Sequence, residues 1–597
     1  MKKFIYYIIL SILFGLFSLL SMEPFSIPLI RWVVPWFLFY FIDEFYKKSI
    51  KSIIMASFLL VLSLCTFTFY WILHLFKEYG GIPLFMSIFL FIPYSFLLNL
   101  KIPFVLIFFT IIKRKFKILR YHNFILIPLV VTIIDIFTPQ VFYWYWGNLL
   151  TQNLYFSQIA DIVGIHGITF FYILFSYVLY RIFKMIQNKK FYLLKNTKFI
   201  RIYSFFGMMF ALIFIYGTTQ YYRYKNISET SKKIRIASIQ PDAPLEKYNE
   251  NKVTQEVLEK LMLDTVPNLM KLAYEKGEQK INLFVLPESA IPYYTTQKNP
   301  LTIQFRLYHP YFEYLILKAN AEFNAEVFFN EFYYEFIPSS KKILTYNSSA
   351  LFSREGVRVN NYHKRRLIAF GEQIPFSEFL DSTGLIFLVP ESIRYSRFQS
   401  GNEFIAIPYS LSYEKVEREF TFFPLDVLEK QEEIKNFFKN RIFRIDGYFM
   451  PLICYEVIQP EYIREFFNQS KHKIDFIVNV TQDKWYGKTV ESYQHLALAK
   501  IRSIELRRGM IRSTNSGVSA AVDLNGEYLK PFYGETLTKQ EVEDIQILDI
   551  PISRDIFTIY AKIGNSWLWL VLFLYLFLVL KQSKRFKVLS FSKRNRN

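Results

Sequence analysis

The sequence predicts a polytopic α-helical membrane domain joined to a layered α/β domain. Apolar runs of about 20 residues, long enough to cross the hydrocarbon core of a bilayer, fill the first 222 residues and recur near 564–580. From Ile234 onward the pattern changes to short apolar strands and amphipathic helices. The composition agrees, because 52% hydrophobic residues, with 65 Phe and 43 Tyr, are too many for an ordinary soluble protein.

Eight membrane spans are predicted from these runs. They lie near 4–20, 24–42, 52–74, 82–112, 121–138, 159–183, 199–222 and 564–580. The fourth run is long and contains Lys101, so we expect a broken or tilted helix there. Lysine and arginine gather in alternate loops and after the last run, as the positive-inside rule requires. The pattern predicts that both termini are cytoplasmic and that the long polar segment lies outside.

The predicted domains are a transmembrane domain of seven spans at 1–223, an external domain at 224–562, and an eighth span with a basic tail at 563–597. The net charge of +21 sits in short loops between apolar runs, which argues against nucleic acid as a partner. Phosphate-binding loops, paired CxxC motifs and HExxH helices are absent from the sequence, and nucleic acid is disfavoured. We predict neither a cofactor nor a metal. Cys65 lies in an apolar run and is expected to be an inert buried thiol.

Two features of the membrane domain leave alternatives open. Arg31, Asp135 and Asp161 lie near the ends of spans, where they could reach lipid headgroups or serve a function inside the domain. We favour the headgroup interpretation. The aromatic stretch Gln140–Asn148 is typical of an interfacial belt, or it contacts a lipid substrate.

The external segment predicts an α/β domain with chemistry at the ends of its strands. Strands are expected at 233–240, 282–288, 325–334, 346–353, 449–456, 473–483 and 518–527, and helices at 252–276 and 490–510. A further strand begins at Ile407, and the charged stretch 410–439 after it resembles a surface excursion.

Acid, base and thiol side chains follow several of these strands. Glu288 ends an apolar strand in LPESA and could take the proton from a thiol. Cys454 in PLICYEV is expected to be free, at a strand-to-helix turn where the backbone N–H of Tyr455 could bind an oxyanion. Lys364 could stabilise the same oxyanion, although Arg365 and Arg366 beside it also fit a solvated basic run.

These segments, together with the DKWYG of TQDKWYG, resemble the Glu-Lys-Cys triad segments of the nitrilase superfamily. With eight spans around that domain, the chain resembles the apolipoprotein N-acyltransferase family nearly end to end. The matching membrane segments include MEPFSIPLI, WILHLFKEYGGIP, FSQIADIVGIHGITF and TIYAKIGNSWLW. The resemblance implies an αββα sandwich with Glu288, Lys364 and Cys454 as catalytic residues. It selects Lys364 because Glu372 of FGE follows at the expected spacing.

The resemblance also implies supporting roles for Glu372 and Glu456, which could orient Lys364 or move protons. Trp485 and Tyr486 could line the entrance for an acyl chain, or simply pack in the core. Three positions depart from the family pattern, and they leave the shape of the acyl pocket open. These are Ala369 in place of Pro, Gln482 in place of Asn, and Tyr486 in place of Phe.

The function implied by the resemblance is transfer of a fatty acyl chain from a glycerophospholipid, through a cysteine thioester, to a diacylglyceryl-modified apolipoprotein. The expected location is the bacterial inner membrane, with the catalytic domain on the outer face of a monomer. A membrane-tethered amidase with the same triad is an alternative. A transporter or receptor with an external binding domain is another, but we see no related halves or charged midplane path.

Overall fold

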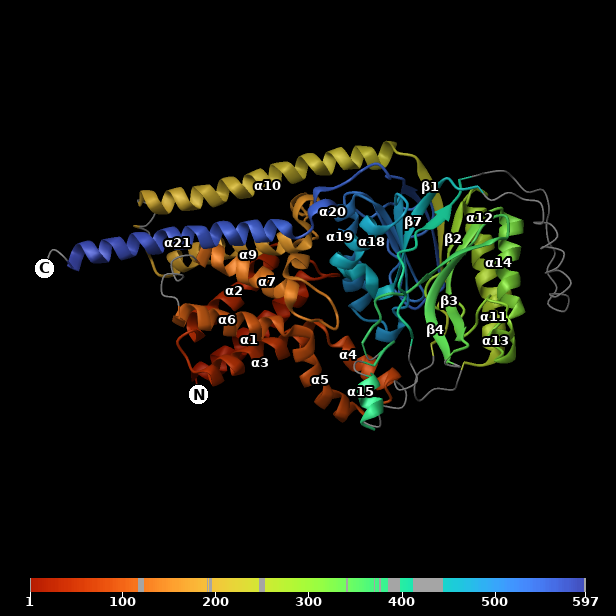
Figure 1. Ribbon diagram of the computed structural model, residues 1–597, viewed down its shortest axis with the longest axis horizontal. Helices are drawn as coiled ribbons and strands as arrows, with labels where there is room; N and C mark the ends of the chain where they lie inside the picture. The colour runs from red at the N-terminus through yellow and green to blue at the C-terminus, as the bar shows by residue number, and fades with distance from the viewer. Residues whose placement is uncertain are drawn as a thin grey trace. The chain divides into compact units, whose positions relative to one another are not determined.

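The computed structural model describes residues 2–594 apart from 116–122, 191, 193–195, 246–252, 340–341, 370, 375–376, 385–397 and 412–443. The chain divides into two compact units, which we describe separately. The first comprises residues 1–70, 88–223 and 558–597, and it is helical. The second comprises residues 71–87 and 224–557, and it contains both sheets (Figure 1). Most of the charged stretch 410–439 lies outside the described residues.

All eight predicted spans contain helices. The long ones are α1 (Lys2–Ser21), α2 (Pro28–Phe45), α3 (Ile50–Thr68), α5 (Leu84–Asn99), α6 (Lys101–Lys115), α7 (Asn123–Phe137), α9 (Ala160–Gln187), α10 (Thr197–Thr230) and α21 (Ser566–Arg594). Helices α5 and α6 share the fourth run and meet at a bend of 58°, which confirms the expected break. Within the described residues, four helices are long and apolar enough to cross a membrane, or five if the bent pair is one span. The number of spans therefore stays a prediction.

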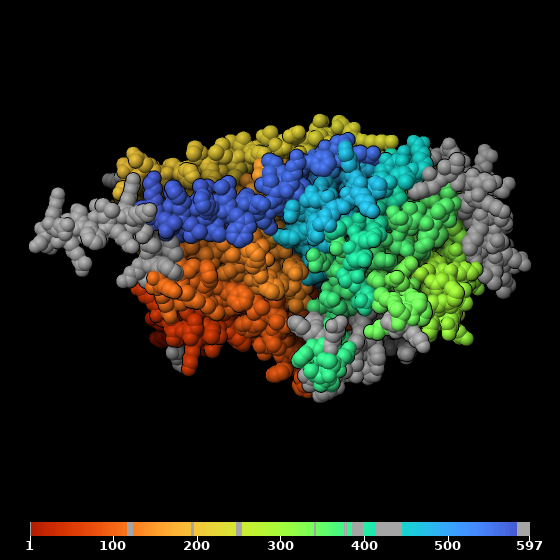
Figure 2. All heavy atoms as spheres, viewed as in Figure 1, coloured from red at the N-terminus to blue at the C-terminus, as the bar shows by residue number. Residues whose placement is uncertain are grey.

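Apolar side chains on the outside of the first unit fit a lipid environment. Helix α21 runs along the visible face of this unit (Figure 2). Its Trp569, Leu570 and Phe573 are exposed. Phe205 and Met208 of α10 are exposed as well. A helix that is apolar on its exposed face is typical of a membrane span.

A buried ion pair overturns the headgroup interpretation of Asp135. Its carboxylate lies 3.0 Å from Lys101 Nζ, and both side chains are fully buried. The ammonium also donates to the carbonyl of Trp144 and lies 3.4 Å from the centre of the Trp144 ring. Asp135 can remain inside the helices because Lys101 neutralises it there. Arg31 and Asp161, each only 5% exposed, are also buried in protein.

The aromatic stretch Gln140–Asn148 is part of the protein core rather than an interfacial belt. Trp144, Tyr145 and Trp146 are each at most 3% exposed. The short helix η3 (Trp146–Leu150) continues this stretch, and Gly147 N donates to Thr169 of α9. The interfacial prediction for these residues is wrong because they pack against neighbouring helices.

The second unit is built on two sheets. The first has the order β11-β1-β2-β3-β4-β5, and the second has the order β10-β9-β8-β7-β6. Their bounds are β1 Lys233–Gln240, β2 Leu283–Val285, β3 Glu326–Ile337, β4 Lys342–Phe352, β5 Arg358–His363, β6 Ile407–Tyr409, β7 Gly447–Ile453, β8 Phe476–Thr481, β9 Gly509–Thr514, β10 Ala520–Val522 and β11 Asp544–Pro551. The predicted strands are confirmed, whereas β5, β9 and β11 were not predicted.

Helices cover the outer face of each sheet, which gives the predicted αββα sandwich (Figure 1). The first sheet is covered by α11 (Gln255–Lys260), α12 (Val266–Lys276) and α14 (Pro310–Phe323), and the second by α18 (Pro460–Gln469) and α19 (Glu491–Leu506). Apolar residues of α12 and α14 form one core cluster with the inner strands.

One segment from between the membrane helices belongs to this second unit. The prediction extended the third span to residue 74, but α3 ends at Thr68. Residues from Trp71 then form α4 (Trp71–His74) and η1 (Leu75–Tyr79). Both pack against η9 (Lys484–Tyr486), the turn that follows β8.

Candidate active site

Cys454 stands on an elbow where β7 ends and the short helix η8 (Cys454–Ile458) begins. Its φ of +51° lies in the left-handed region, which is uncommon for a residue with a side chain and is concentrated at functional sites. The residue is 4% exposed. The preceding strand is completely buried at its end because β7 pairs with β6 and β8 on either side. The fold therefore holds this thiol in one place at the carboxyl end of a central strand.

Glu288 lies three residues beyond β2, in the turn that continues this strand. One carboxylate oxygen accepts a hydrogen bond from Asn347 Nδ2 at 2.8 Å, and the other accepts from the backbone N–H of Gln482 at 2.9 Å. The thiol of Cys454 is a further hydrogen-bond partner of this carboxylate. The carboxylate is therefore fixed beside the sulfur by donors from both sheets.

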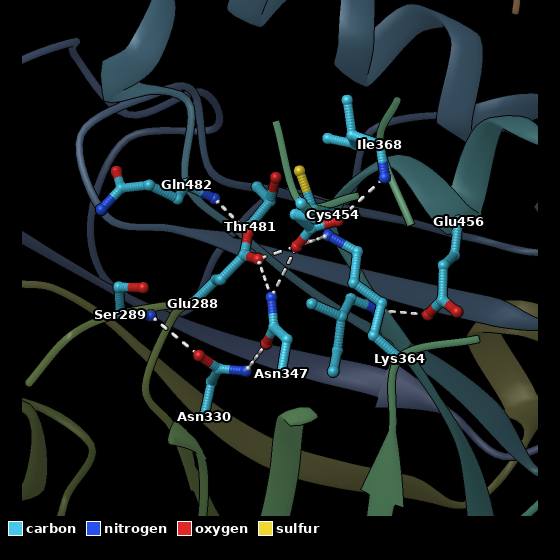
Figure 3. Close-up of polar contacts among 12 residues, drawn as sticks. Glu288, Ser289, Asn330, Asn347, Lys364, Ile368, Cys454, Glu456, Thr481 and Gln482 are labelled. Carbon is cyan, nitrogen blue, oxygen red and sulfur yellow. Dashed lines mark hydrogen bonds and ion pairs between the residues drawn. The ribbon is translucent and has the colours of Figure 1, made fainter. Parts of the chain in front are cut away.

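Lys364 follows β5 and is 1% exposed. Its backbone N–H donates to the carbonyl of Asn347 at 2.8 Å, which places the two side chains side by side. Its Nζ lies 2.8 Å from Glu372. The same atom lies 3.5 Å from Glu288 (Figure 3). The structure therefore brings Glu288, Lys364, Glu372 and Cys454 together, as the sequence predicted.

The charges of this cluster determine which groups carry protons. Burial and the Glu288 charge raise the pKa of the Cys454 thiol above its ordinary value of 9.0. Burial also raises the pKa of Glu288 above 4.5, although the Lys364 charge opposes this shift. Burial alone lowers the pKa of Lys364, but the two carboxylates outweigh it and raise the pKa above 10.5. At neutral pH the lysine is charged and the cysteine is a thiol beside a buried carboxyl group.

Glu456 contacts the backbone around the site, and in the part of the chain that the structure describes no hydrogen bond joins it to the Lys364 side chain. Its carboxylate, 0% exposed, accepts from the backbone N–H groups of Ile453 at 2.9 Å and Arg365 at 2.8 Å. Tyr362 donates to it from β5 at 2.8 Å. Glu456 therefore ties the strand before Cys454 to the loop after Lys364, while Glu372 is the carboxylate nearest to the lysine.

The predicted acyl-entrance residues lie on the turn η9. The ring centres of Tyr486 and Trp71 are 4.8 Å apart, and those of Trp485 and Tyr79 are 4.9 Å apart. Trp485 is nevertheless 38% exposed. These contacts give Tyr486 a packing role, and a role in lining an entrance stays a prediction for both residues.

Sequence reasoning missed Asn347, which joins the two carboxylates of the site. Its Nδ2 donates to Glu288 and, at 2.9 Å, to Glu372. Its Oδ1 accepts from Asn330 at 2.7 Å, and Asn330 also holds the backbone N–H of Ser289 at 3.1 Å (Figure 3). The available signal was an asparagine at the start of the strand pattern YNSSALF, which is weak because asparagine is common at strand ends.

A second polar cluster lies just beyond β8. The ligand atoms of Asp483, Glu491 and His495 all lie within 4.8 Å of one another, so this group has metal-ligand spacing. However, Arg512 donates to both oxygens of Asp483, at 3.0 and 2.8 Å. Because the guanidinium already neutralises this carboxylate, the geometry favours a hydrogen-bonded network over a bound cation.

Comparison with known proteins places these features in a family. Residues 235–554 match the model for carbon-nitrogen hydrolases. The second unit is thus a carbon-nitrogen hydrolase domain, and the protein is a polytopic membrane protein that carries it.

Residues 14–178 match the model of the apolipoprotein N-acyltransferase N-terminal domain. The chain belongs to the apolipoprotein N-acyltransferase family. It is 30% identical to apolipoprotein N-acyltransferase 2 of Leptospira interrogans, over 93% of this chain and 92% of the relative. It is 25% identical to the apolipoprotein N-acyltransferase of Haemophilus influenzae, over 89% and 87% of the two chains. A nitrilase-superfamily protein of Saccharomyces cerevisiae aligns with 54% of this chain and 92% of its own, at 15% identity and a TM-score of 0.33.

Proposed function

We propose that the protein transfers a fatty acyl chain from a glycerophospholipid to the α-amine of the S-diacylglyceryl cysteine of an apolipoprotein, through a thioester at Cys454. The observation that carries this proposal is a cluster in which the buried carboxylate of Glu288 contacts both the Cys454 thiol and the buried ammonium of Lys364. Membership of the family supports the lipid substrates. The catalytic domain would face the outer side of the bacterial inner membrane, where both lipid-anchored substrates are accessible.

In the first half-reaction, Glu288 takes the proton of the Cys454 thiol and the sulfur attacks the ester carbonyl of the phospholipid. Charged Lys364 and the N–H of Tyr455 stabilise the negative oxygen that develops on that carbon. The ester C–O bond then breaks, and Glu288 returns its proton to the leaving lysophospholipid alkoxide. The acyl group remains on sulfur, and the site regains its starting charge.

In the second half-reaction, the neutral α-amine of the acceptor attacks the thioester carbonyl. Glu288 accepts a proton from the nitrogen, and the Cys454 thiolate leaves and is reprotonated by Glu288. The product is an amide. Because an amide is more stable than a thioester, the transfer needs no nucleotide. Glu372 keeps Lys364 in place through both steps.

Intact-mass analysis tests the proposal. The full-length protein in phosphatidylethanolamine vesicles should gain one fatty acyl mass at Cys454 and release one lysophospholipid. The Cys454→Ala variant should gain none. Addition of a diacylglyceryl-modified lipopeptide should remove the mass from the protein and transfer it to the peptide amine.

Two outcomes would oppose the proposal. An acylated Cys454→Ala variant would exclude this residue as the nucleophile. Release of free fatty acid at the same rate with and without the lipopeptide would indicate a hydrolase instead of a transferase.

A further inference from the structure

A row of buried polar side chains runs from the nucleophile elbow into the second sheet. In the strand register, Leu452 of β7 is paired with Asn479 of β8, and Asn479 is paired with Arg512 of β9. Asn479 and Arg512 are both 0% exposed. Polar side chains at such positions must satisfy their hydrogen bonds within the protein, so their partners reveal what they hold.

The amide of Asn479 holds the backbone of the elbow. Its Nδ2 donates to the carbonyl of Leu452 at 3.2 Å and to the carbonyl of Cys454 itself at 3.3 Å. These carbonyls lie where the strand ends and Cys454 turns to a positive φ. A strained residue of this kind persists only where its surroundings over-determine it.

Two further residues hold Asn479 in turn. Its Oδ1 accepts from Arg512 Nη1 at 2.7 Å, which fixes the orientation of the amide. Arg512 Nη2 is anchored by Asp483, whose two oxygens it contacts. Burial alone raises the pKa of Asp483, but Arg512 and His495 outweigh it and hold the pKa at about 2. The arginine therefore keeps its charged partner throughout the pH range of activity measurements.

We infer that Asn479 is a positioning residue for the reaction, and that Arg512 and Asp483 support it. By holding the carbonyl of Cys454, the amide fixes the direction of the thiol and of the following N–H, which the proposed acylation uses. Among the described residues, Asn479 makes no hydrogen bond to Glu288, Lys364 or Glu372. It therefore acts on the chemistry through the geometry of the elbow, and this inference rests on the proposed function.

The test is Asn479→Asp, which keeps the shape and the acceptor for Arg512 but removes both donor bonds. Asn320→Asp is the matched control, because Asn320 is also 0% exposed and donates to two backbone carbonyls, those of Ala325 and Phe352. Misplacement of a reacting group by about 1 Å can lower a rate by about 100-fold. We expect Asn479→Asp to lower single-turnover acylation by about 10- to 100-fold.

The half-saturating phospholipid concentration should change by no more than about twofold, because the row does not touch substrate. The control variant Asn320→Asp should acylate at the wild-type rate, although its Tm should change by about as much as that of Asn479→Asp. If Asn479→Asp does not fold, Asn479→Ser takes its place, because serine retains one donor and adds no buried charge. This variant should lower the single-turnover acylation rate by a smaller factor.

Alkylation of Cys454 by iodoacetamide keeps this inference testable apart from the proposed function. Peptide mass separates Cys454 from Cys65. Alkylation at pH 7 should slow in Asn479→Asp together with acylation. A wild-type protein that is alkylated but never acylated would defeat the proposed function alone. Wild-type rates of both reactions in Asn479→Asp, or equal losses in Asn320→Asp, would overturn the positioning role.

Discussion

Replacement of Glu288 by glutamine isolates the role of the base. Glutamine keeps the length of the side chain and one acceptor oxygen, but it cannot take a proton from sulfur. Its amide group would also face one of two donors, Asn347 Nδ2 or the N–H of Gln482. Acylation would then depend on the fraction of Cys454 that ionises to thiolate without a general base.

The expected size of the effect follows from the electrostatics of the thiol. The pKa of Cys454 is raised above 9.0, so at pH 7 less than about 1% of it is thiolate without a base. Loss of the Glu288 charge should lower the pKa of Cys454 part of the way back toward 9.0, because that charge is one of the causes that raise it. We therefore expect acylation to fall by about 100- to 1000-fold, within the usual range for a general base.

The assay is single-turnover acylation followed by intact mass. The residual rate of Glu288→Gln should rise about tenfold per pH unit below the pKa of the thiol, whereas the wild-type rate should depend less steeply on pH above the pKa of Glu288. Glu326→Gln is the control, since Glu326 is also buried and accepts hydrogen bonds from Ser410 N and Oγ elsewhere in the domain. A Glu288→Gln rate above one tenth of wild type would refute the reasoning.

Three further predictions follow from the site and its supporting turn. Asn347→Leu removes two hydrogen bonds to carboxylates, each worth about 1.5–3 kcal/mol, and should lower acylation at least about tenfold by intact mass; a wild-type rate would contradict its role. On acidification, wild-type acylation should fall as Glu288 is protonated, with a midpoint above 4.5 because burial raises this pKa; a stopped-flow pH profile with a midpoint at or below 4.5 would oppose this. Gly487→Ala should lower the Tm in differential scanning fluorimetry, because φ is +63° and a Cβ would lie 2.6 Å from His74 Nε2; Gly207→Ala, with open space around it, should leave the Tm unchanged or raise it.

The sequence was sufficient for the parts of the site that are read from strand ends. Glu288 and Cys454 each follow a buried apolar strand, and strands of one sandwich bring their ends together. Lys364 was harder to choose, because Arg365 and Arg366 carry the same charge. The resemblance selected it, and its 2.8 Å contact with Glu372 agrees with that choice.

The contacts that sequence reasoning missed are those between polar residues far apart in the chain. Asn347 lies 59 positions from Glu288, and nothing in a local pattern indicates their hydrogen bond. Asp135 was expected at headgroups because its partner Lys101, 34 positions away, was taken only as a break in a span. Hydropathy also extended the third span through Trp71, since burial against protein and against lipid produce the same apolar pattern.

The segment from Trp71 to Ser87 has a practical consequence for dissecting the protein. A recombinant fragment limited to 224–557 would lack Trp71, which donates to Gln494 at 3.2 Å, and Tyr79, which donates to the carbonyl of Lys484 at 2.9 Å. The aromatic residues Trp485 and Tyr486 of η9 would lose these packing partners, and the apolar surface exposed in this way would be prone to self-association. Supplying residues 71–87 as a tethered peptide should be the minimum requirement for a well-behaved isolated α/β unit.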